Sequence, residues 1–376
     1  MHGRWNMKKI LQVGITDVYG GTEAYLMNQY SRLNHNQIQY EFMCIQSGID
    51  AITWAQKYKD MKVIFLPFNR RQKPFHTYFI FIQWMYHNAS KYDAMVFNMN
   101  GLNVIFPALA YKVFGGKKLI IHSHNSGEID GNFSRVMQGI RLVNKKILNH
   151  IVDIRLACSL LAGRYLYNDM KFEVIRNGVD TKRFRFDKSA RLRLRNEYNL
   201  SGKMIIGHIG RFSYQKNQEF LIPLIAELKK INKDVVLFMI GDCKSDQPLF
   251  EKVSDLINKY GVNDNVIVES PKANINEYYS MFDVFVLPSR FEGLPLVGVE
   301  AQSSGVCCFF SDSISKELSI TPLAHYLPTT HPSLWAGEIL NTPLPKERDI
   351  FAKMVKENGF DILDQVTKVK NIIDKA

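Results

Sequence analysis

Two cations and two carboxylates in the second half of the sequence stand just beyond stretches that read as parallel strands. Arg211 and Lys216 follow one such stretch, and two fixed positive charges at that position suit a diphosphate. A pair of solvated surface cations is the alternative interpretation. Glu292 and Glu300 follow another stretch, and two carboxylates so placed could hold two hydroxyl-bearing parts of one ligand.

The segment between the two glutamates changes from loop to helix. Pro295 is well placed as an early helical residue, because its missing N–H costs nothing at that position. The backbone N–H groups around residues 293–296, apart from the proline, would then face the oxygens of a ligand. Glu292 would lie on the loop and Glu300 about two turns into the helix. Helix capping could explain Glu292 alone, but it does not explain the pair of glutamates.

The first half of the sequence offers two weaker candidates. Gly20 and Gly21 follow the first strand-like stretch and let a backbone approach a ligand closely. Their loop is neither a dinucleotide-binding glycine motif nor a phosphate-binding P-loop, so an ordinary strand–helix turn is the alternative. His122 and His124 end another stretch and could be metal ligands, acid–base groups or hydrogen-bonding groups for a sugar, or could be structural. No carboxylate or cysteine clusters with them, so we expect no metal.

Short apolar runs alternate with helix-like stretches along nearly the whole chain, which predicts parallel sheets with right-handed crossovers. The expected strands are 10–15, 40–45, 63–66, 94–97 and 119–122, then 204–209, 235–240, 266–268, 284–287 and 306–310. The expected helices include 23–33, 106–113, 218–231, 249–260 and 275–282. The fold class is therefore α/β, with two doubly wound domains joined near residues 177–180. Ligands of such sheets bind beyond the carboxyl ends of the strands, which is where all the candidates above lie.

Length and composition exclude several classes of protein. The chain has 376 residues, of which 46% are hydrophobic and 22% charged, so it is not disordered, collagen-like or a coiled coil. No apolar run is long enough to span a membrane, and the N-terminus does not resemble a signal peptide. Five scattered cysteines without metal or redox spacing predict reduced thiols in a cytoplasmic protein.

Charge is distributed unevenly along the chain. Residues 1–180 contain 22 Lys and Arg against 12 Asp and Glu, whereas the remainder contains 26 against 24. An anionic surface or substrate is expected to meet the basic half. The basic run 70–73 precedes the aromatic-rich stretch 75–86, and a second basic stretch is 135–146. Both suit docking at an anionic membrane interface, with a core helix as the alternative for 75–86.

The segment 288–300 resembles the signature of the family 4 retaining glycosyltransferases. It reads Pro-Ser, then Glu-Gly-Leu-Pro, then a second glutamate after seven intervening residues. Other blocks match in the family's order: Gly20-Gly21-Thr22-Glu23, Ala157-Cys158-Ser159, 175–180, Gly210-Arg211 with Lys216-Asn217, and Ser311-Asp312 with Glu317. Within the family, the sequence is most similar to bacterial enzymes of capsular or exopolysaccharide assembly.

This resemblance implies the GT-B fold, in which two Rossmann-like domains face a central cleft. It implies an N-terminal acceptor domain over 1–180, a C-terminal nucleotide-sugar domain over 181–349, and a final helix within 350–376 that crosses back to the first domain. The implied activity is that of a hexosyltransferase-type glycosyltransferase (EC 2.4), which moves a sugar from a nucleotide sugar to a lipid-linked saccharide. Uridine diphosphate is the expected carrier, guanosine diphosphate stays open, and no metal or other cofactor is expected. The expected location is the inner face of the plasma membrane, with no nucleic-acid partner.

The resemblance also implies roles for individual residues. Arg211 and Lys216 would bind the diphosphate, and Glu300 the ribose hydroxyls. Glu292 would position the donor sugar, with no enzymic nucleophile needed. The remaining implied contacts are Gly210, Gly293, Leu294, Pro295 and Leu296 with the donor, Gly20 and Gly21 in the cleft, and His124, or else His122, with the sugar. Ser270 replaces a glycine common before the base-contacting segment, which leaves the base open.

Other functions on similar folds remain as alternatives. A sugar-nucleotide epimerase would lack the two-glutamate block. A non-catalytic sugar-binding protein of the periplasm would need an export signal. A dehydrogenase would need the glycine fingerprint that neither half contains.

Overall fold

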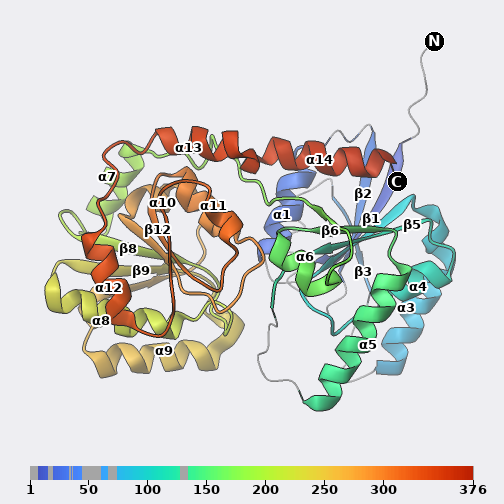
Figure 1. Cartoon of the computed structure of the whole chain (residues 1–376), viewed down its shortest axis with the longest axis horizontal. Coiled ribbons are helices and arrows are strands. Elements are labelled where there is room, and N and C mark those ends of the chain that lie inside the picture. Colours follow the sequence, from blue (N-terminus) through green and yellow to red (C-terminus); the bar gives the residue numbers. More distant parts are fainter. Residues whose placement is uncertain are drawn as a thin grey trace, which may run out of the picture. The chain divides into compact units, whose positions relative to one another are not determined.

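The computed structural model of the chain describes residues 7–15, 20–33, 35, 37–44, 61–66, 74–127 and 134–375 (Figure 1). The chain forms two compact units. The N-terminal unit comprises Met1–Glu128, Asn132–Arg176 and Leu363–Ala376, and the C-terminal unit contains Asn177–Ile362. The last residues of the chain thus group with the unit in which the chain begins.

The described part of the N-terminal unit contains a seven-stranded parallel sheet in the order β3-β2-β1-β4-β5-β6-β7. The order reverses where β1 pairs with β4, with Ile10 opposite Ala94. The strands are β1 (Lys8–Ile15), β2 (Ile38–Cys44), β3 (Lys62–Phe65), β4 (Ala94–Met99), β5 (Lys118–Ser123), β6 (Ile154–Ala157) and β7 (Glu173–Val174). The helices are α1 (Gly21–Tyr30), α3 (Pro74–Asn88), α4 (Phe106–Val113), α5 (Arg135–Ile151), α6 (Leu160–Tyr167) and α14 (Ile362–Lys375), the last of which begins at the boundary between the units.

The C-terminal unit is built around a six-stranded parallel sheet in the order β10-β9-β8-β11-β12-β13. This order reverses where β8 pairs with β11, with Ile206 opposite Val284. Its strands are β8 (Met204–Ile209), β9 (Val235–Ile240), β10 (Val266–Glu269), β11 (Val284–Leu287), β12 (Cys307–Ser311) and β13 (Ala324–Leu327). Its helices are α7 (Lys188–Glu197), α8 (Leu221–Ile231), α9 (Gln247–Tyr260), α10 (Ile275–Met281), α11 (Leu296–Ser303), α12 (Pro332–Asn341) and α13 (Ile350–Val355).

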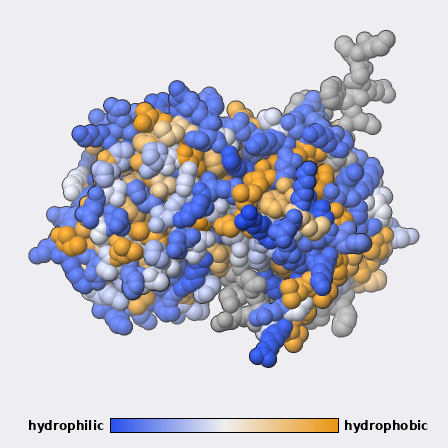
Figure 2. Space-filling model, viewed as in Figure 1, coloured by the Kyte–Doolittle hydropathy of each residue, from blue (hydrophilic) through white to orange (hydrophobic). Residues whose placement is uncertain are grey.

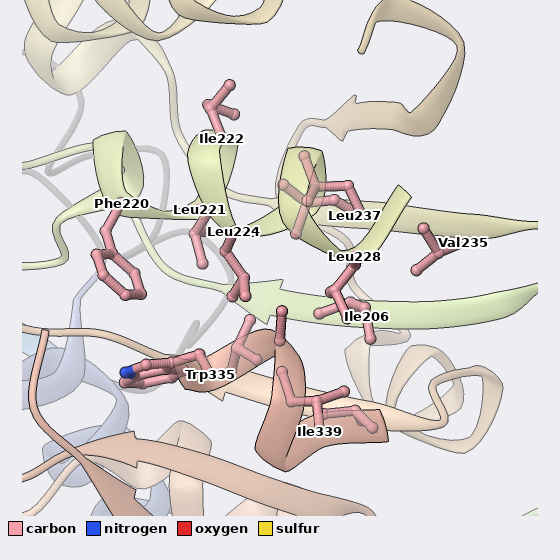
Figure 3. Close-up of a cluster of buried hydrophobic side chains, with 14 of the residues drawn as sticks. Ile206, Phe220, Leu221, Ile222, Leu224, Leu228, Val235, Leu237, Trp335 and Ile339 are labelled. Carbon is pink, nitrogen blue, oxygen red and sulfur yellow. The ribbon is translucent and has the colours of Figure 1, made fainter. Parts of the chain in front are cut away.

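A cluster of buried side chains joins α8 and α12 to the sheet of the C-terminal unit (Figure 3). Helix α8 buries Leu221, Leu224 and Leu228, the three- and four-residue spacing of one helix face. Trp335 of α12 is fully buried, and its indole N–H donates to the Pro328 carbonyl at 2.9 Å. Because helices cover the sheet, β9 and β11 are buried along their whole length, which explains their continuous apolar sequences.

The predicted parallel α/β architecture is confirmed. The predicted bounds of β8, β9, β11 and α4 agree with the structure to the residue. Strands β6, β7 and β13 were absent from the predicted set. They are only two to four residues long, and β6, β7 and β13 carry Arg155, Glu173 and His325 respectively, so their apolar signal is weak.

No helix among the described residues combines the length and the hydropathy that crossing a bilayer requires. The five cysteines are free thiols, and Cys243 is the one that is not buried.

Candidate functional site

Two loops of the C-terminal unit emerge side by side because β8 and β11 are paired neighbours. We call residues 210–217 the β8 loop and residues 288–295 the β11 loop. The backbone N–H of Arg290 donates to the Gln215 carbonyl at 2.9 Å, and the Asn217 amide donates to the Pro288 carbonyl at 3.1 Å. These contacts fix each loop against the other at the carboxyl end of the sheet.

One cation and one carboxylate of the two predicted pairs meet across these loops, in a contact that was not predicted. Lys216 Nζ lies 2.7 Å from Glu292 Oε1, and the side chains are only 15% and 9% exposed. The Gln215 amide donates to the other carboxylate oxygen of Glu292 at 3.2 Å. Little water reaches the pair, so the attraction between the two charges is only weakly screened. The predicted diphosphate cation is therefore already held by a carboxylate, which an incoming anion would have to replace or share.

The second predicted cation, Arg211, is differently placed. Its guanidinium has no hydrogen-bond or ion-pair partner in the described part of the chain. The residue before it, Gly210, leaves room for the stem of Lys216, because a Cβ at 210 would lie 3.2 Å from Lys216 Cδ. A Cβ at Gly241, at the end of β9, would lie 2.0 Å from the Gly210 carbonyl oxygen. Glycine at 241 thus allows the backbone of the β8 loop to approach the neighbouring strand end.

Helix α11 begins directly after the β11 loop. Gly293, Leu294 and Leu296 are buried, yet none of their backbone N–H groups reaches an acceptor among the described residues. Buried donors without partners are rare in folded proteins, and a helix N-terminus favours anions. The carbonyl of Leu294 accepts from the Asn177 amide at 2.7 Å, which holds the loop in place.

Two details of the predicted helix differ in the structure. Pro295 is the residue before the helix, with φ −70° and ψ 120°, rather than an early helical residue. Glu300 is the fifth residue of α11, so it lies just beyond the first turn and not about two turns in. The reason is that the helix starts only after the extended backbone of Pro295.

Glu300, within this helix, accepts a hydrogen bond from a tyrosine. The hydroxyl of Tyr279, on α10, donates to Glu300 Oε2 at 2.7 Å. Burial raises the pKa of Glu300 to about 7, although the Tyr279 hydrogen bond and the charges of Arg183 and Lys216 act in the opposite direction. A carboxyl with such a pKa changes charge near neutral pH, which is typical of functional positions.

The N-terminal unit places its predicted histidines beyond and within β5. His124 is half-buried, and its Nε2 lies 3.0 Å from Asn98 Oδ1. His122 is 1% exposed, and its Nε2 has no partner within the described chain; it lines a small internal cavity together with Gln12 and Tyr25. The two rings are 4.1 Å apart. His124 is therefore the more exposed of the two histidines.

The predicted glycines open helix α1. Gly20 is its N-cap and donates its N–H to Glu23 Oε2 at 3.0 Å. A Cβ at Gly21 would meet no described atom within 4 Å, so packing within the unit does not require glycine there. Residues 17–19 of the same loop lie outside the described residues, as does the basic run 70–73.

Metal ligands do not cluster in the described part of the chain: no group of three or more His, Cys, Asp and Glu there could hold a metal ion. Three supporting residues had no predicted role, namely Gln215, Gly241 and Tyr279. A glycine after a strand is a signal that could have pointed to Gly241. The other two touch the glutamates only through tertiary contacts.

Comparison with known proteins gives a consistent result. Residues 191–320, which include both loops and α11, match the model of the family "Glycosyl transferases group 1". The chain is 27% identical over 384 aligned residues to the putative glycosyltransferase EpsF of Bacillus subtilis, covering 98% of this chain and 96% of EpsF. It is 24% identical to the capsular polysaccharide biosynthesis glycosyltransferase CapH of Staphylococcus aureus, covering 97% and 98% of the two chains. The crystal structure of Anabaena HepE with UDP and glucose has a TM-score of 0.77, with 17% identity and coverage of 98% and 100%.

Proposed function

Because this chain belongs to the group 1 glycosyltransferases, of family 4 and the GT-B fold, we propose that it transfers a sugar from a nucleotide sugar to a saccharide acceptor with retention of configuration. The observation that carries the proposal is the start of α11. Buried residues there have backbone N–H groups without an acceptor in the described part of the chain, and they adjoin a loop that supplies Lys216 and Arg211. A diphosphate would supply negative charge for the two cations and oxygen acceptors for the N–H groups.

The reaction we propose needs no enzymic nucleophile. The bond between the anomeric carbon and the phosphate oxygen breaks, and the diphosphate leaves with the electron pair. The acceptor oxygen attacks from the same face, and its proton passes to the leaving phosphate. Donors fixed in advance stabilise the charge that develops on the diphosphate. Lys216, Arg211 and the backbone N–H groups of residues 293, 294 and 296 are the donors in this proposal.

The two glutamates take different roles in this proposal. Glu300 accepts hydrogen bonds from the ribose hydroxyls, a task for an acceptor held in place by Tyr279. Glu292 positions Lys216 and the donor sugar, because its carboxylate is already engaged by Lys216 and Gln215. We further propose uridine diphosphate as the carrier and surface-polysaccharide assembly as the process. Support comes from UDP in the HepE structure and from the names of EpsF and CapH.

A panel of nucleotide sugars tests the proposal. We expect one uridine diphosphate sugar to raise the melting temperature and to be hydrolysed slowly to free diphosphate in the absence of acceptor. Release of a guanosine diphosphate would correct the base alone. Conversion to an isomeric nucleotide sugar without release of diphosphate would identify an epimerase. If no member of the panel bound, the proposed function would be wrong.

We also propose that three helices of the N-terminal unit dock on an anionic membrane, where a lipid-linked acceptor would lie. Helix α4 contacts both α3 and α5, and hydrophobic side chains are exposed over this region (Figure 2). They are Phe79, Ile82 and Tyr86 of α3, Leu109 and Val113 of α4, and Val136, Ile140, Leu142 and Val143 of α5. Exposed apolar side chains in such number are typical of an interaction surface.

The charges of the same helices favour an anionic bilayer over a protein partner of mixed charge. None of α3, α4 and α5 contains Asp or Glu, whereas α5 carries exposed Arg135 and Lys146. Basic residues beside an apolar surface bind anionic lipid with about 1 kcal/mol each.

Vesicle co-sedimentation checks the membrane proposal. We expect binding to vesicles of phosphatidylcholine mixed with phosphatidylglycerol, and little binding to phosphatidylcholine alone. Replacing Leu142 and Val143 by Gln should weaken binding about tenfold, since each loses burial of an apolar side chain. Ile231→Gln is the matched control, because Ile231 is 70% exposed on α8 of the other unit. Equal recovery on both vesicles, or equal loss in the control, would contradict the proposal.

A further inference from the structure

A chain of buried amides in the N-terminal unit leads to His124. The Asn98 Nδ2 group, on β4, lies 3.0 Å from Gln12 Oε1 and 3.2 Å from the Val13 carbonyl oxygen, both on β1. Its Oδ1 lies 3.0 Å from His124 Nε2. Asn98 and Gln12 are 3% and 1% exposed, so water does not compete for these bonds.

The backbone carbonyl of Val13 settles which way the Asn98 amide points. A carbonyl oxygen can only accept, so the atom of Asn98 that faces it must be the NH2 nitrogen. The oxygen of Asn98 therefore faces His124, and it too can only accept. It follows that Nε2 of His124 carries a proton. Burial lowers the pKa of His124 to about 3, so the ring is neutral and Nδ1 has no proton.

The bare nitrogen carries a lone pair that no described residue uses. His124 is half-buried, one residue beyond the end of β5, and its Nδ1 has no partner in the described part of the chain. The rings that pack against it are Tyr25 of α1, at 4.9 Å, and His122, at 4.1 Å. Burial keeps His122 neutral by lowering its pKa, and raises the pKa of Tyr25, so neither adds a charge at neutral pH.

We propose that Asn98 is a positioning residue that fixes His124 as the Nε2–H tautomer, so that His124 meets the bound sugar as a hydrogen-bond acceptor through Nδ1. The sugar contact rests on the proposed function. The sugar group at this position is then a hydroxyl, which can donate. A uronic acid carboxylate in the same place would set its lone pairs against that of Nδ1, and a neutral histidine would offer it no compensating charge. His124 and Asn98 together thereby select neutral sugars over uronic acids.

The tautomer can be measured directly in the ligand-free protein. In nitrogen-15 spectra of protein labelled at histidine, with His124 assigned through the His124→Asn variant, we expect one Nε2–H tautomer from pH 5 to 8. Asn98→Ala should bring the His124 signals to a mixture of tautomers. A protonated Nδ1 in the wild-type protein, or an imidazolium at pH 6, would overturn the proposal whatever the substrate is. Because this readout uses the wild-type chain, it does not depend on the folding of a variant.

Two substitutions of His124 test the contact itself. The amide of Asn falls near the position of Nδ1, and that of Gln near Nε2. His124→Asn should therefore keep at least tenfold more kcat/KM than His124→Gln with the nucleotide sugar, while the affinity for the free nucleoside diphosphate changes in neither. His331, exposed at the start of α12, is the control for both substitutions. A smaller loss in His124→Gln would overturn the acceptor role of Nδ1.

In the wild type, kcat/KM for the nucleotide-linked uronic acid should be at least tenfold lower than kcat/KM for the corresponding neutral sugar. Asn98→Ala should bring these two values closer together. An unchanged ratio of the two kcat/KM values in Asn98→Ala would overturn the proposed selection of neutral sugars over uronic acids. Absence of any transfer by a wild-type protein that shows the Nε2–H tautomer would count against the proposed function, and with it against the sugar contact, but not against the assignment of the tautomer.

Discussion

Lys216→Ala lowers kcat/KM for the nucleotide sugar about 100- to 1000-fold, if Lys216 stabilises the leaving diphosphate as we propose. This is the loss that follows removal of one preorganised donor to a developing negative charge. Steady-state kinetics measure it, together with the affinity for the free nucleoside diphosphate. Lys230→Ala is the control, because Lys230 also pairs with a glutamate, Glu227 at 2.6 Å, but is 67% exposed on α8. We expect its kinetics to equal those of the wild type.

The same substitution also removes the partner of a buried carboxylate. In this variant Glu292 loses the lysine and keeps the hydrogen bond from the Gln215 amide. Loss of the ion pair should lower the free energy of unfolding by about 1–3 kcal/mol. Adding Glu292→Gln to Lys216→Ala removes the buried charge that has lost its lysine partner and should restore much of that stability without restoring activity. If activity returned together with stability, Lys216 would be a structural residue, and near-normal kinetics in Lys216→Ala would contradict the assignment of the donor site.

Glu300→Gln is expected to move stability and ligand affinity in opposite directions. The pKa of Glu300 is about 7 in the folded protein against an ordinary value of 4.5, so the folded state disfavours the ionised form. The cost is absent below about pH 4.5, grows as the pH rises, and is complete above about pH 7. A glutamine cannot ionise and still offers an oxygen to Tyr279. The variant should therefore be more stable than the wild type by about 1–3 kcal/mol at pH 8, and by less than about 1 kcal/mol at pH 5.

The same substitution is expected to weaken binding of the nucleoside diphosphate. At pH 8 the wild-type carboxylate accepts from the ribose hydroxyls more strongly than an amide does, so Glu300→Gln should weaken binding about tenfold. At pH 5 the wild-type group is protonated, and the difference should nearly vanish. Denaturant unfolding and calorimetry at the two pH values measure both effects, with Glu227→Gln as the surface control. A stability difference that is independent of pH would contradict the raised pKa, and an unchanged affinity at pH 8 would remove Glu300 from the ribose site.

Local patterns were sufficient to predict many of the strands and their boundaries. β9 and β11 are continuous apolar runs between polar segments, and β8 is interrupted only by Gly207 and His208. This pattern survives in the sequence because each strand is buried on both faces. The two-residue strand β7 exists only because β6 offers it a partner edge, as Glu173 pairs with Leu156. No window of the sequence around Glu173 contains that information.

The candidate site divides in the same way. The residue types and spacing of the β8 and β11 loops, including Glu292, Glu300, Arg211 and Lys216, were sufficient to predict the family. The diphosphate-binding chemistry that they indicate stays a prediction. The ion pair of Lys216 with Glu292 was not predictable, because it joins residues 76 positions apart whose meeting depends on β8 and β11 being neighbours in the sheet. The position of the proton on His124 was not predictable either. The Val13 carbonyl on β1 orients the Asn98 amide on β4, and that amide in turn determines which nitrogen of His124 is protonated. The sequence by itself determines which residue types follow each strand and at what spacing. The partners, charge and protonation of these groups depend on which strands are neighbours in the folded sheet.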